Sequence, residues 1–140
     1  MSAIHLSSKS EHAIKALVRL ALPHEGPVQS REIASFAGIP PKFAEQVMRD
    51  LRQAGLVESQ RGKGGGYVLA RDPAAVSFAD VIDLIDGSNG GTSRMLPGDQ
   101  AESLVAPVWR EVRECTRAIL GSATIADAAA RAIDTPMYYI

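Results

Sequence analysis

A run of six residues, Arg61-Gly62-Lys63-Gly64-Gly65-Gly66, constrains the fold of this chain more than any other feature. Residues 56–60 before it and 67–70 after it have the composition of short strands. Glycine accepts backbone angles that other residues avoid. The run therefore predicts a tight, exposed loop that joins the two strands in a β-hairpin.

Glycine-rich runs also occur in nucleotide-binding loops, but this run matches neither of the two common motifs. A phosphate-binding P-loop needs serine or threonine directly after its lysine, and then a helix. Lys63 is instead followed by glycine and a strand. A dinucleotide-binding fingerprint needs glycine where this chain has Tyr67.

Two helices are predicted in the first 38 residues. The first begins at a capping box, Ser8-Lys9-Ser10-Glu11, and ends before Pro23. Its apolar residues have the spacing of one helix face: Ile14, Leu17, Val18 and Ala21. The second helix covers about residues 31–37, with Ser30 as its cap and Gly38 as its end.

A third helix completes the pattern. It begins at Pro40-Pro41, because proline is accepted in a first turn, and ends at Gly55. Its inner face is apolar: Ala44, Val47, Met48 and Leu51. Two short helices joined by a glycine-containing turn of about four residues form a helix-turn-helix. With the hairpin after them, we predict a mainly α-helical winged helix-turn-helix with a small β-hairpin wing.

The second half of the chain is predicted to be helical. Ser77 and Asp80 cap a helix that ends at Asp86, and a loop over 87–100 follows. A long helix then ends near residue 120, and Pro107 leaves its start open between Ala101 and Ala106. Its apolar seam has the 3–4 spacing of paired helices: Val105, Val108, Val112, Cys115 and Ile119.

Thr124 and Asp127 cap a last helix, and residues 137–140 are not assigned. We divide the chain into a winged helix-turn-helix part, 1–76, and a loop and dimerisation part, 77–140, within one structural unit.

The formal net charge of −1 conceals an asymmetry between the halves. Residues 1–71 contain ten basic and six acidic side chains, whereas residues 72–140 contain five arginines and ten acidic side chains. An excess of positive charge in the part with the helix-turn-helix favours a polyanionic partner.

A DNA-binding role needs side chains that can enter a groove. On the third helix, Gln46 can pair with adenine, Glu45 can accept from cytosine, and Lys42 or Arg49 can reach guanine or phosphate. Arg61 suits a narrow minor groove. The candidate DNA-binding residues are Ser30, Arg31, Lys42, Phe43, Glu45, Gln46, Arg49, Arg61, Lys63 and Gly64. A merely solvated surface would carry similar charges, and it is the combination with the wing that favours DNA.

Other classes of protein have little support in the sequence. No apolar run approaches the roughly 18 residues that cross a bilayer. The first residues lack the apolar core of a signal peptide, so we expect a cytoplasmic protein. A single cysteine excludes a disulfide framework and an all-cysteine metal site within one chain. No pairing of nucleophile and base is visible, so we do not expect an enzyme.

Blocks of residues over nearly the whole chain resemble the Rrf2 family of bacterial winged-helix transcription regulators. The most specific block is residues 51–70, and others are Glu32-Ile33-Ala34, Asp80-Val81-Ile82, Trp109 and Thr124-Ile125-Ala126-Asp127. The resemblance implies a homodimer that binds a roughly palindromic operator through Lys42, Phe43, Glu45 and Arg61. It also implies that the long helix, including Trp109, is the dimerisation helix. Family members often have serine at the Lys42 position and tyrosine at the Phe43 position, so the base preference does not carry over.

The chain departs from the cluster-binding members of that family, which carry three cysteines in the loop before the long helix. Residues 87–104 contain no cysteine, so we expect no iron–sulphur cluster and no other cofactor. Glu11 matches a position that supplies an acidic ligand in some members. We interpret Glu11 here as part of the helix cap and His12 as a surface residue.

Cys115 has two interpretations. It is either a small apolar residue of the dimer seam, which we favour, or a redox-active thiol that pairs with its counterpart across a two-fold axis. We predict a homodimeric, DNA-binding repressor whose effector is unknown. The alternative is a winged helix that binds proteins and not DNA.

Overall fold

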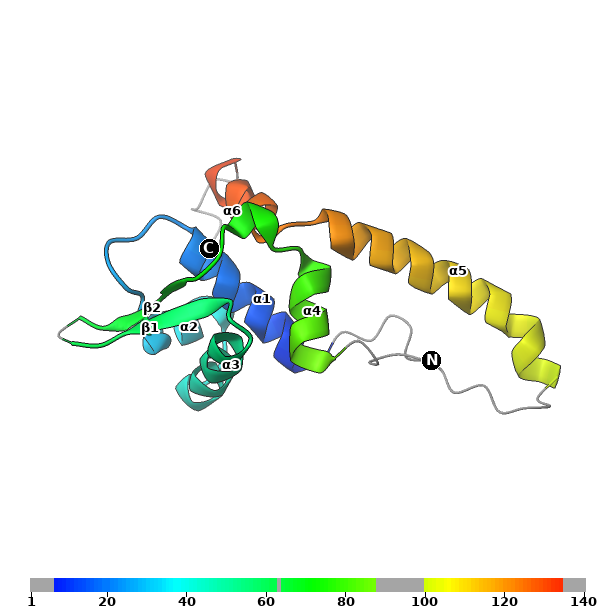
Figure 1. Cartoon of the computed structure of the whole chain (residues 1–140), viewed down its shortest axis with the longest axis horizontal. Helices are drawn as coiled ribbons and strands as arrows, with labels where there is room; N and C mark the ends of the chain where they lie inside the picture. The colour runs from blue at the N-terminus through cyan, green and yellow to red at the C-terminus, as the bar shows by residue number, and fades with distance from the viewer. Residues whose placement is uncertain (1–6, 63, 88–99, 135–140) are drawn as a thin grey trace.

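A computed structural model describes residues 7–62, 64–87 and 100–134 (Figure 1). The elements in chain order are α1 (Ser8–Ala21), α2 (Ser30–Ala37), α3 (Pro41–Gln53), β1 (Val57–Gln60), β2 (Gly66–Leu69), η1 (Pro73–Ala75), α4 (Phe78–Asp86), α5 (Gln100–Ser122) and α6 (Ile125–Asp134). The fold is mainly helical with one small hairpin, as predicted. Lys63, residues 88–99 of the predicted loop and the 137–140 tail lie outside the described residues.

Helix α1 lies at the centre of the fold and packs against α2, α3, α4 and α6 (Figure 1). Leu17 is 1% exposed, and Ala13 and Ala16 are fully buried. The core extends from α1 to Ile33 of α2, Met48 and Leu51 of α3, Val81 of α4 and Ile125 of α6. One apolar core therefore includes side chains from both halves of the sequence.

Helices α2 and α3 form the predicted helix-turn-helix. Gly38 ends α2 in the left-handed conformation, with φ of 71°. Pro41 occupies the first turn of α3, where its missing N–H has no intrahelical partner. The apolar face expected on α3 is buried, from Ala44 to Leu51.

The two-stranded hairpin is bridged by one further extended residue, Val28. Strands β1 and β2 are antiparallel, with Val57 opposite Leu69 and Gln60 opposite Gly66. Val28 bridges β2, since its N–H donates to the Tyr67 carbonyl at 3.0 Å and the Tyr67 N–H donates back at 2.8 Å. A Cβ on Gly66 would lie 2.4 Å from the Val28 oxygen, so glycine is needed for this close approach.

Two of the predicted helix caps are wrong. The cap of α1 is Ser7, whose Oγ accepts from the Ser10 N–H at 3.0 Å, and Ser8 is already helical. Glu11 is not part of the cap, and its Oε1 forms an ion pair with Lys15 Nζ at 3.8 Å. Ser30 is the first residue of α2, and the preceding Gln29 makes no side-chain cap.

The remaining caps agree with the prediction. Ser77 and Asp80 form a reciprocal capping box at α4, and Thr124 and Asp127 form one at α6. On α4, Val81 is buried, and Phe78, Ile82 and Ile85 pack against the core as expected.

Helix α5 extends from the body as a single long arm (Figure 1). It begins at Gln100 and continues through Pro107, so neither Ala101 nor Ala106 is its first residue. With 23 residues it is about 35 Å long at the helical rise of 1.5 Å per residue. Arg117 donates to both carboxylate oxygens of Asp83, with NH1 2.8 Å from Oδ1, and this ties α5 to α4.

Among the described residues, no helix is both long and apolar enough to span a membrane.

Candidate nucleic-acid interface

The outer face of α3 carries five of the ten predicted DNA-binding residues. Lys42, Phe43, Glu45, Gln46 and Arg49 are all exposed. Phe43, 58% exposed, is a large apolar side chain that the core does not use. Because the opposite face of α3 is anchored in the core, these side chains are presented on a rigid element.

The wing projects from the body beside the helix-turn-helix (Figure 1). Arg61 and Gly64 are exposed near its tip. A Cβ on Gly65 would lie 2.5 Å from the Gln60 oxygen, so the turn is too tight for a side chain there. The glycine run was predicted to allow a tight loop, and the close backbone contact at Gly65 shows why glycine is needed there.

Two of the predicted DNA-binding residues lie at the start of α2. Ser30 is half-buried, and Arg31 is exposed with its Nε donating to Gln29 Oε1 at 3.0 Å. The side chain of Gln29 is therefore engaged with Arg31 and does not cap the helix.

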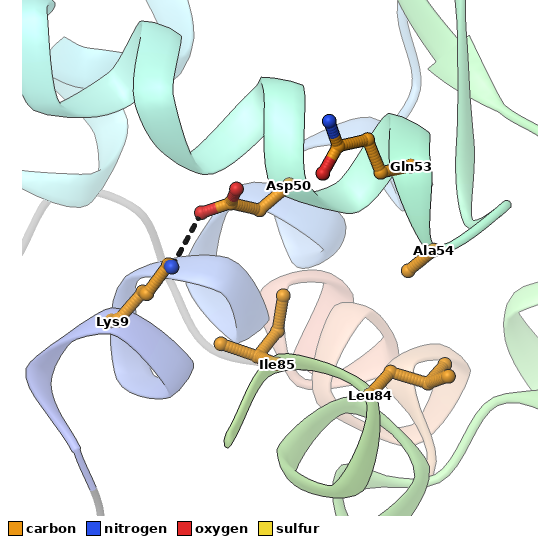
Figure 2. Close-up of a pocket in the computed structure, with 6 residues that line it drawn as sticks. All are labelled: Lys9, Asp50, Gln53, Ala54, Leu84 and Ile85. Carbon is orange, nitrogen blue, oxygen red and sulfur yellow. Dashed lines mark ion pairs between the residues drawn. The ribbon is translucent and has the colours of Figure 1, made fainter. Parts of the chain in front are cut away.

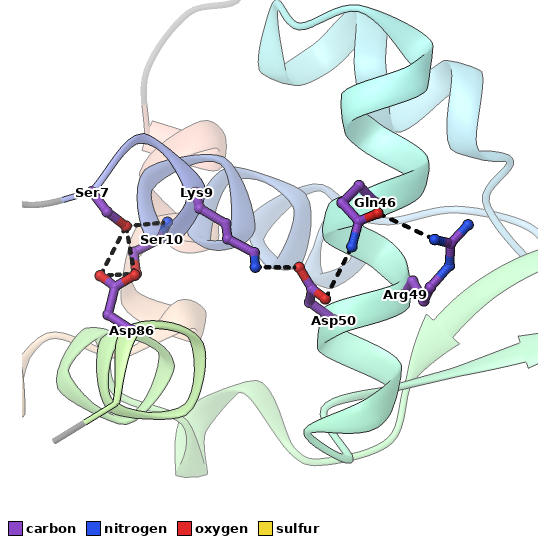
Figure 3. Close-up of polar contacts among 7 residues, drawn as sticks. All are labelled: Ser7, Lys9, Ser10, Gln46, Arg49, Asp50 and Asp86. Atoms are coloured by element: carbon purple, nitrogen blue, oxygen red, sulfur yellow. Dashed lines mark hydrogen bonds and ion pairs between the residues drawn. The ribbon is translucent and has the colours of Figure 1, made fainter.

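A chain of polar contacts leads from the outer face of α3 to α1 (Figure 3). Arg49 NH1 donates to Gln46 Oε1 at 3.1 Å, and Gln46 Nε2 donates to Asp50 Oδ1 at 3.2 Å. The other Asp50 oxygen lies 2.8 Å from Lys9 Nζ.

Sequence reasoning missed Asp50 and Lys9. The four-residue spacing from Gln46 to Asp50 could have signalled the contact within α3. The contact with Lys9 depends on how α1 packs against α3, and no local pattern contains that information.

The Lys9–Asp50 pair borders a pocket of about 280 Å³ at the junction of α1, α3 and α4 (Figure 2). Gln53 of α3, Ala54 directly after that helix, and Leu84 and Ile85 of α4 complete its lining. On the α1 side, Asp86 accepts from Ser7 Oγ at 2.7 Å and from Ser10 Oγ at 2.7 Å (Figure 3). The start of α1 is thus held against both α3 and α4.

The predicted dimer seam is exposed along α5. Val105, Val108 and Ile119 are 44%, 59% and 68% exposed. Cys115 is also exposed and is a free thiol. Trp109 and Val112 are half-buried. A row of apolar side chains on a projecting helix is an unusual surface for a monomer.

Comparison with known proteins shows the family to which this chain belongs. A model of the Rrf2 family, described as an iron-dependent transcriptional regulator, matches residues 6–131. The chain belongs to the Rrf2 family.

Relatives of this Rrf2 protein are regulators of transcription. It is 36% identical over 135 residues to a putative HTH-type transcriptional regulator of Mycobacterium tuberculosis H37Rv, covering 93% of this chain and 84% of the relative. The structure of CymR, the global cysteine regulator of Bacillus subtilis, matches with a TM-score of 0.78 and 30% identity, covering 91% of this chain and 98% of that one. T. potens IscR matches with a TM-score of 0.74 and 31% identity, covering 97% and 95%.

The protein is therefore a DNA-binding transcription regulator of winged-helix architecture.

The family is described as iron-dependent, which raises the question of whether the side chains of this Rrf2 protein suit an iron–sulphur cluster. Its one cysteine lies on α5. No group of three or more His, Cys, Asp or Glu side chains is placed to hold a metal ion within residues 7–62, 64–87 and 100–134. The donor set does not fit a cysteine-ligated cluster.

His12 differs from its predicted surface position. It is half-buried, and its Nδ1 has no hydrogen-bond partner among the described residues. Glu11 beside it is exposed, so the two side chains do not share an environment.

Proposed function

We propose that this Rrf2 regulator acts in the cytoplasm as a homodimeric repressor of a roughly palindromic operator. In each half-site, α3 enters the major groove and the wing lies along the neighbouring minor groove. The observation that carries the proposal is the two-sided character of α3, which is anchored in the core by one face and presents polar side chains and Phe43 on the other.

The side chains divide between two tasks. Lys42, Phe43, Glu45, Gln46 and Arg49 face the bases or phosphates, and Arg61 with Lys63 and Gly64 makes the minor-groove contact. Ser30 and Arg31 at the start of α2 contact phosphate, since a helix N-terminus favours anions. Phosphate contacts supply affinity, and base contacts supply the choice of sequence.

The proposed dimer forms through α5. An isologous interface would cover Val105, Val108, Val112 and Ile119 by the same residues of a second copy, with Trp109 at its edge. Two-fold symmetry of the protein then accounts for a palindromic operator.

The proposed regulator works without an iron–sulphur cluster. A cluster of the usual kind needs several thiolate ligands, and this chain provides one cysteine, on α5.

Cys115 lies on the exposed face of α5, so both of its roles remain: packing in the seam, or a disulfide between two copies. Non-reducing electrophoresis after mild peroxide distinguishes them. A band that stays at monomer mass supports the packing role.

The proposed function is tested by selecting fragments from random duplex DNA with the purified protein and titrating the enriched sequence at several salt concentrations. We expect one palindromic motif and an affinity that falls steeply as salt rises. Binding to partner proteins with no salt-dependent DNA binding would favour the protein-interaction alternative.

Arg61→Ala tests the wing. If Arg61 contacts a base edge, the variant should lose about 1–3 kcal/mol of operator binding free energy. Arg71→Ala, which removes the same charge from an exposed residue just after β2, is the control. Equal affinity of the Arg61 variant and the wild type at physiological salt would contradict the proposed role of the wing.

A further inference from the structure

We infer that Lys9 and Asp50 are positioning residues that set the base preference of Arg49 through Gln46. The inference rests on the proposed function, in which the outer face of α3 reads DNA. Lys9 lies on α1, and neither it nor Asp50 is among the proposed DNA contacts.

The Gln46 amide has one orientation that satisfies both of its neighbours. A carboxylate such as Asp50 can only accept hydrogen bonds, and the guanidinium of Arg49 can only donate them. Nε2 must therefore face Asp50, at 3.2 Å, and Oε1 must face Arg49, at 3.1 Å (Figure 3). Because bidentate pairing with adenine uses both amide groups, Gln46 acts at the proposed interface by holding Arg49 and not by pairing with adenine.

The orientation of Gln46 depends on Asp50, and that of Asp50 depends on Lys9. The Asp50 side chain is 17% exposed, and its buried Oδ2 makes no hydrogen bond within the described residues; Lys9 Nζ, 2.8 Å away, balances its charge as an ion pair. Removing Lys9 leaves a mostly buried carboxylate without the cation that balances its charge, which is costly. The side chain then gains by rotating toward water, and Oδ1 moves away from Gln46.

Arg49 reads DNA best when its guanidinium is held in place before binding. A long flexible side chain loses rotamer entropy when it binds, and support from neighbouring side chains reduces that cost. Only NH1 is engaged by Gln46 in the hydrogen bonds described above, so the other guanidinium nitrogens can face a guanine edge. When the support is lost, Arg49 keeps its charge and its attraction to phosphate but loses its fixed direction.

The chain offers a matched pair of variants for the test. Lys9 and Lys15 both lie on α1, and their side chains are 47% and 46% exposed. Lys15 is paired with Glu11 of its own helix, at 3.8 Å. Lys9→Met and Lys15→Met therefore remove the same charge and leave similar exposed chains, but only the first interrupts the path to Arg49.

The experiment measures the specificity ratio, which is the affinity for the selected operator divided by that for a scrambled duplex. For Lys9→Met we expect this ratio to fall about tenfold, within the range of one bidentate arginine–guanine contact, with little change in binding to the scrambled duplex. For Lys15→Met the ratio should match that of the wild type. Lys9→Arg should restore the ratio, and in a Gln46→Ala background Lys9→Met should have no further effect.

The outcomes separate the inference from the function on which it rests. If the wild type selects an operator but the two lysine variants behave alike, the positioning role is overturned and the DNA-binding function stands. The same holds if Lys9→Met keeps its full effect without Gln46. If the wild type selects no motif, the proposed function and the inference fail together. Circular dichroism of each variant confirms that it is folded.

Discussion

Ser7 shows how one side chain joins two distant parts of the chain. Its Oγ accepts from the Ser10 N–H and donates to Asp86, which is 79 residues away. Ser10, which is fully buried, donates to the same carboxylate. The cap of α1 is therefore also a contact with the end of α4.

Substitution of Ser7 and Ser8 distinguishes the two possible caps. Ser7→Ala should lower the free energy of unfolding by about 1 kcal/mol or more, because a cap is lost together with a bond to Asp86. Ser8→Ala should change it little, since Ser8 is already helical. Urea unfolding followed by circular dichroism measures both, and equal losses would contradict the assignment of the cap to Ser7.

The cap of α1 also shows what a local pattern cannot decide. Ser8 with Glu11 fits the capping-box spacing as well as any pair in the sequence. Ser7 with Ser10 is selected because Asp86 accepts from both hydroxyl groups, and that contact exists only after α1 and α4 have packed. The ion pair between Lys9 and Asp50 could not be predicted for the same reason, since it forms only when α1 packs against α3.

Gly66 is a second residue whose role depends on distant packing. Gly66→Ala should destabilise the protein by about 1–3 kcal/mol, because the new Cβ would lie 2.4 Å from the Val28 carbonyl and force the backbones apart. Gly121→Ala on α5, where a Cβ meets no atom within 4 Å, should be neutral or stabilising. Chemical denaturation of the two variants gives the comparison.

The elements themselves were largely predictable. The buried and exposed faces of α3 follow its apolar spacing, and the caps of α4 and α6 follow their motifs because both partners lie within one turn. The wing was predictable from its glycines. The bridge between Val28 and Tyr67 was not, since it joins residues that are 39 positions apart.

The junction of α4 and α5 should respond to acid. Hydrogen bonds from Arg117 lower the pKa of Asp83 below its ordinary value of 3.8. The folded pKa is thus below the unfolded one, so the stabilisation is present at neutral pH and declines as the pH falls from about 4 through the folded value.

Asp83→Asn tests this pH dependence of the stability. It should cost about 0.5–1 kcal/mol at pH 7, as expected for an exposed pair, and progressively less below pH 4. Thermal unfolding of wild type and variant across this range is the measurement, with Glu114→Gln, an exposed acid on α5, as control. A difference that is independent of pH would show that the ion pair does not stabilise the junction.

At the scale of the whole molecule, the exposed face of α5 is the feature that predicts assembly. Val108→Asp places a carboxylate in the proposed seam and should convert the proposed dimer to monomer in sedimentation experiments. Operator affinity should fall at least about tenfold, since one half-site contact is lost. Arg110→Asp, at a position outside the seam, should remain dimeric. A monomeric wild type would contradict the proposed interface.

The central position of α1 has a consequence for how the protein can be divided. Helix α1 contacts both helices of the helix-turn-helix, and it also contacts α4 and α6 from the second half of the chain. A fragment that ends at residue 76 would expose the part of the core that Val81 and Ile125 cover. The helix-turn-helix half is therefore not a transplantable module, and any chimaera that joins parts of two such regulators must keep α1, α4 and α6 from the same parent.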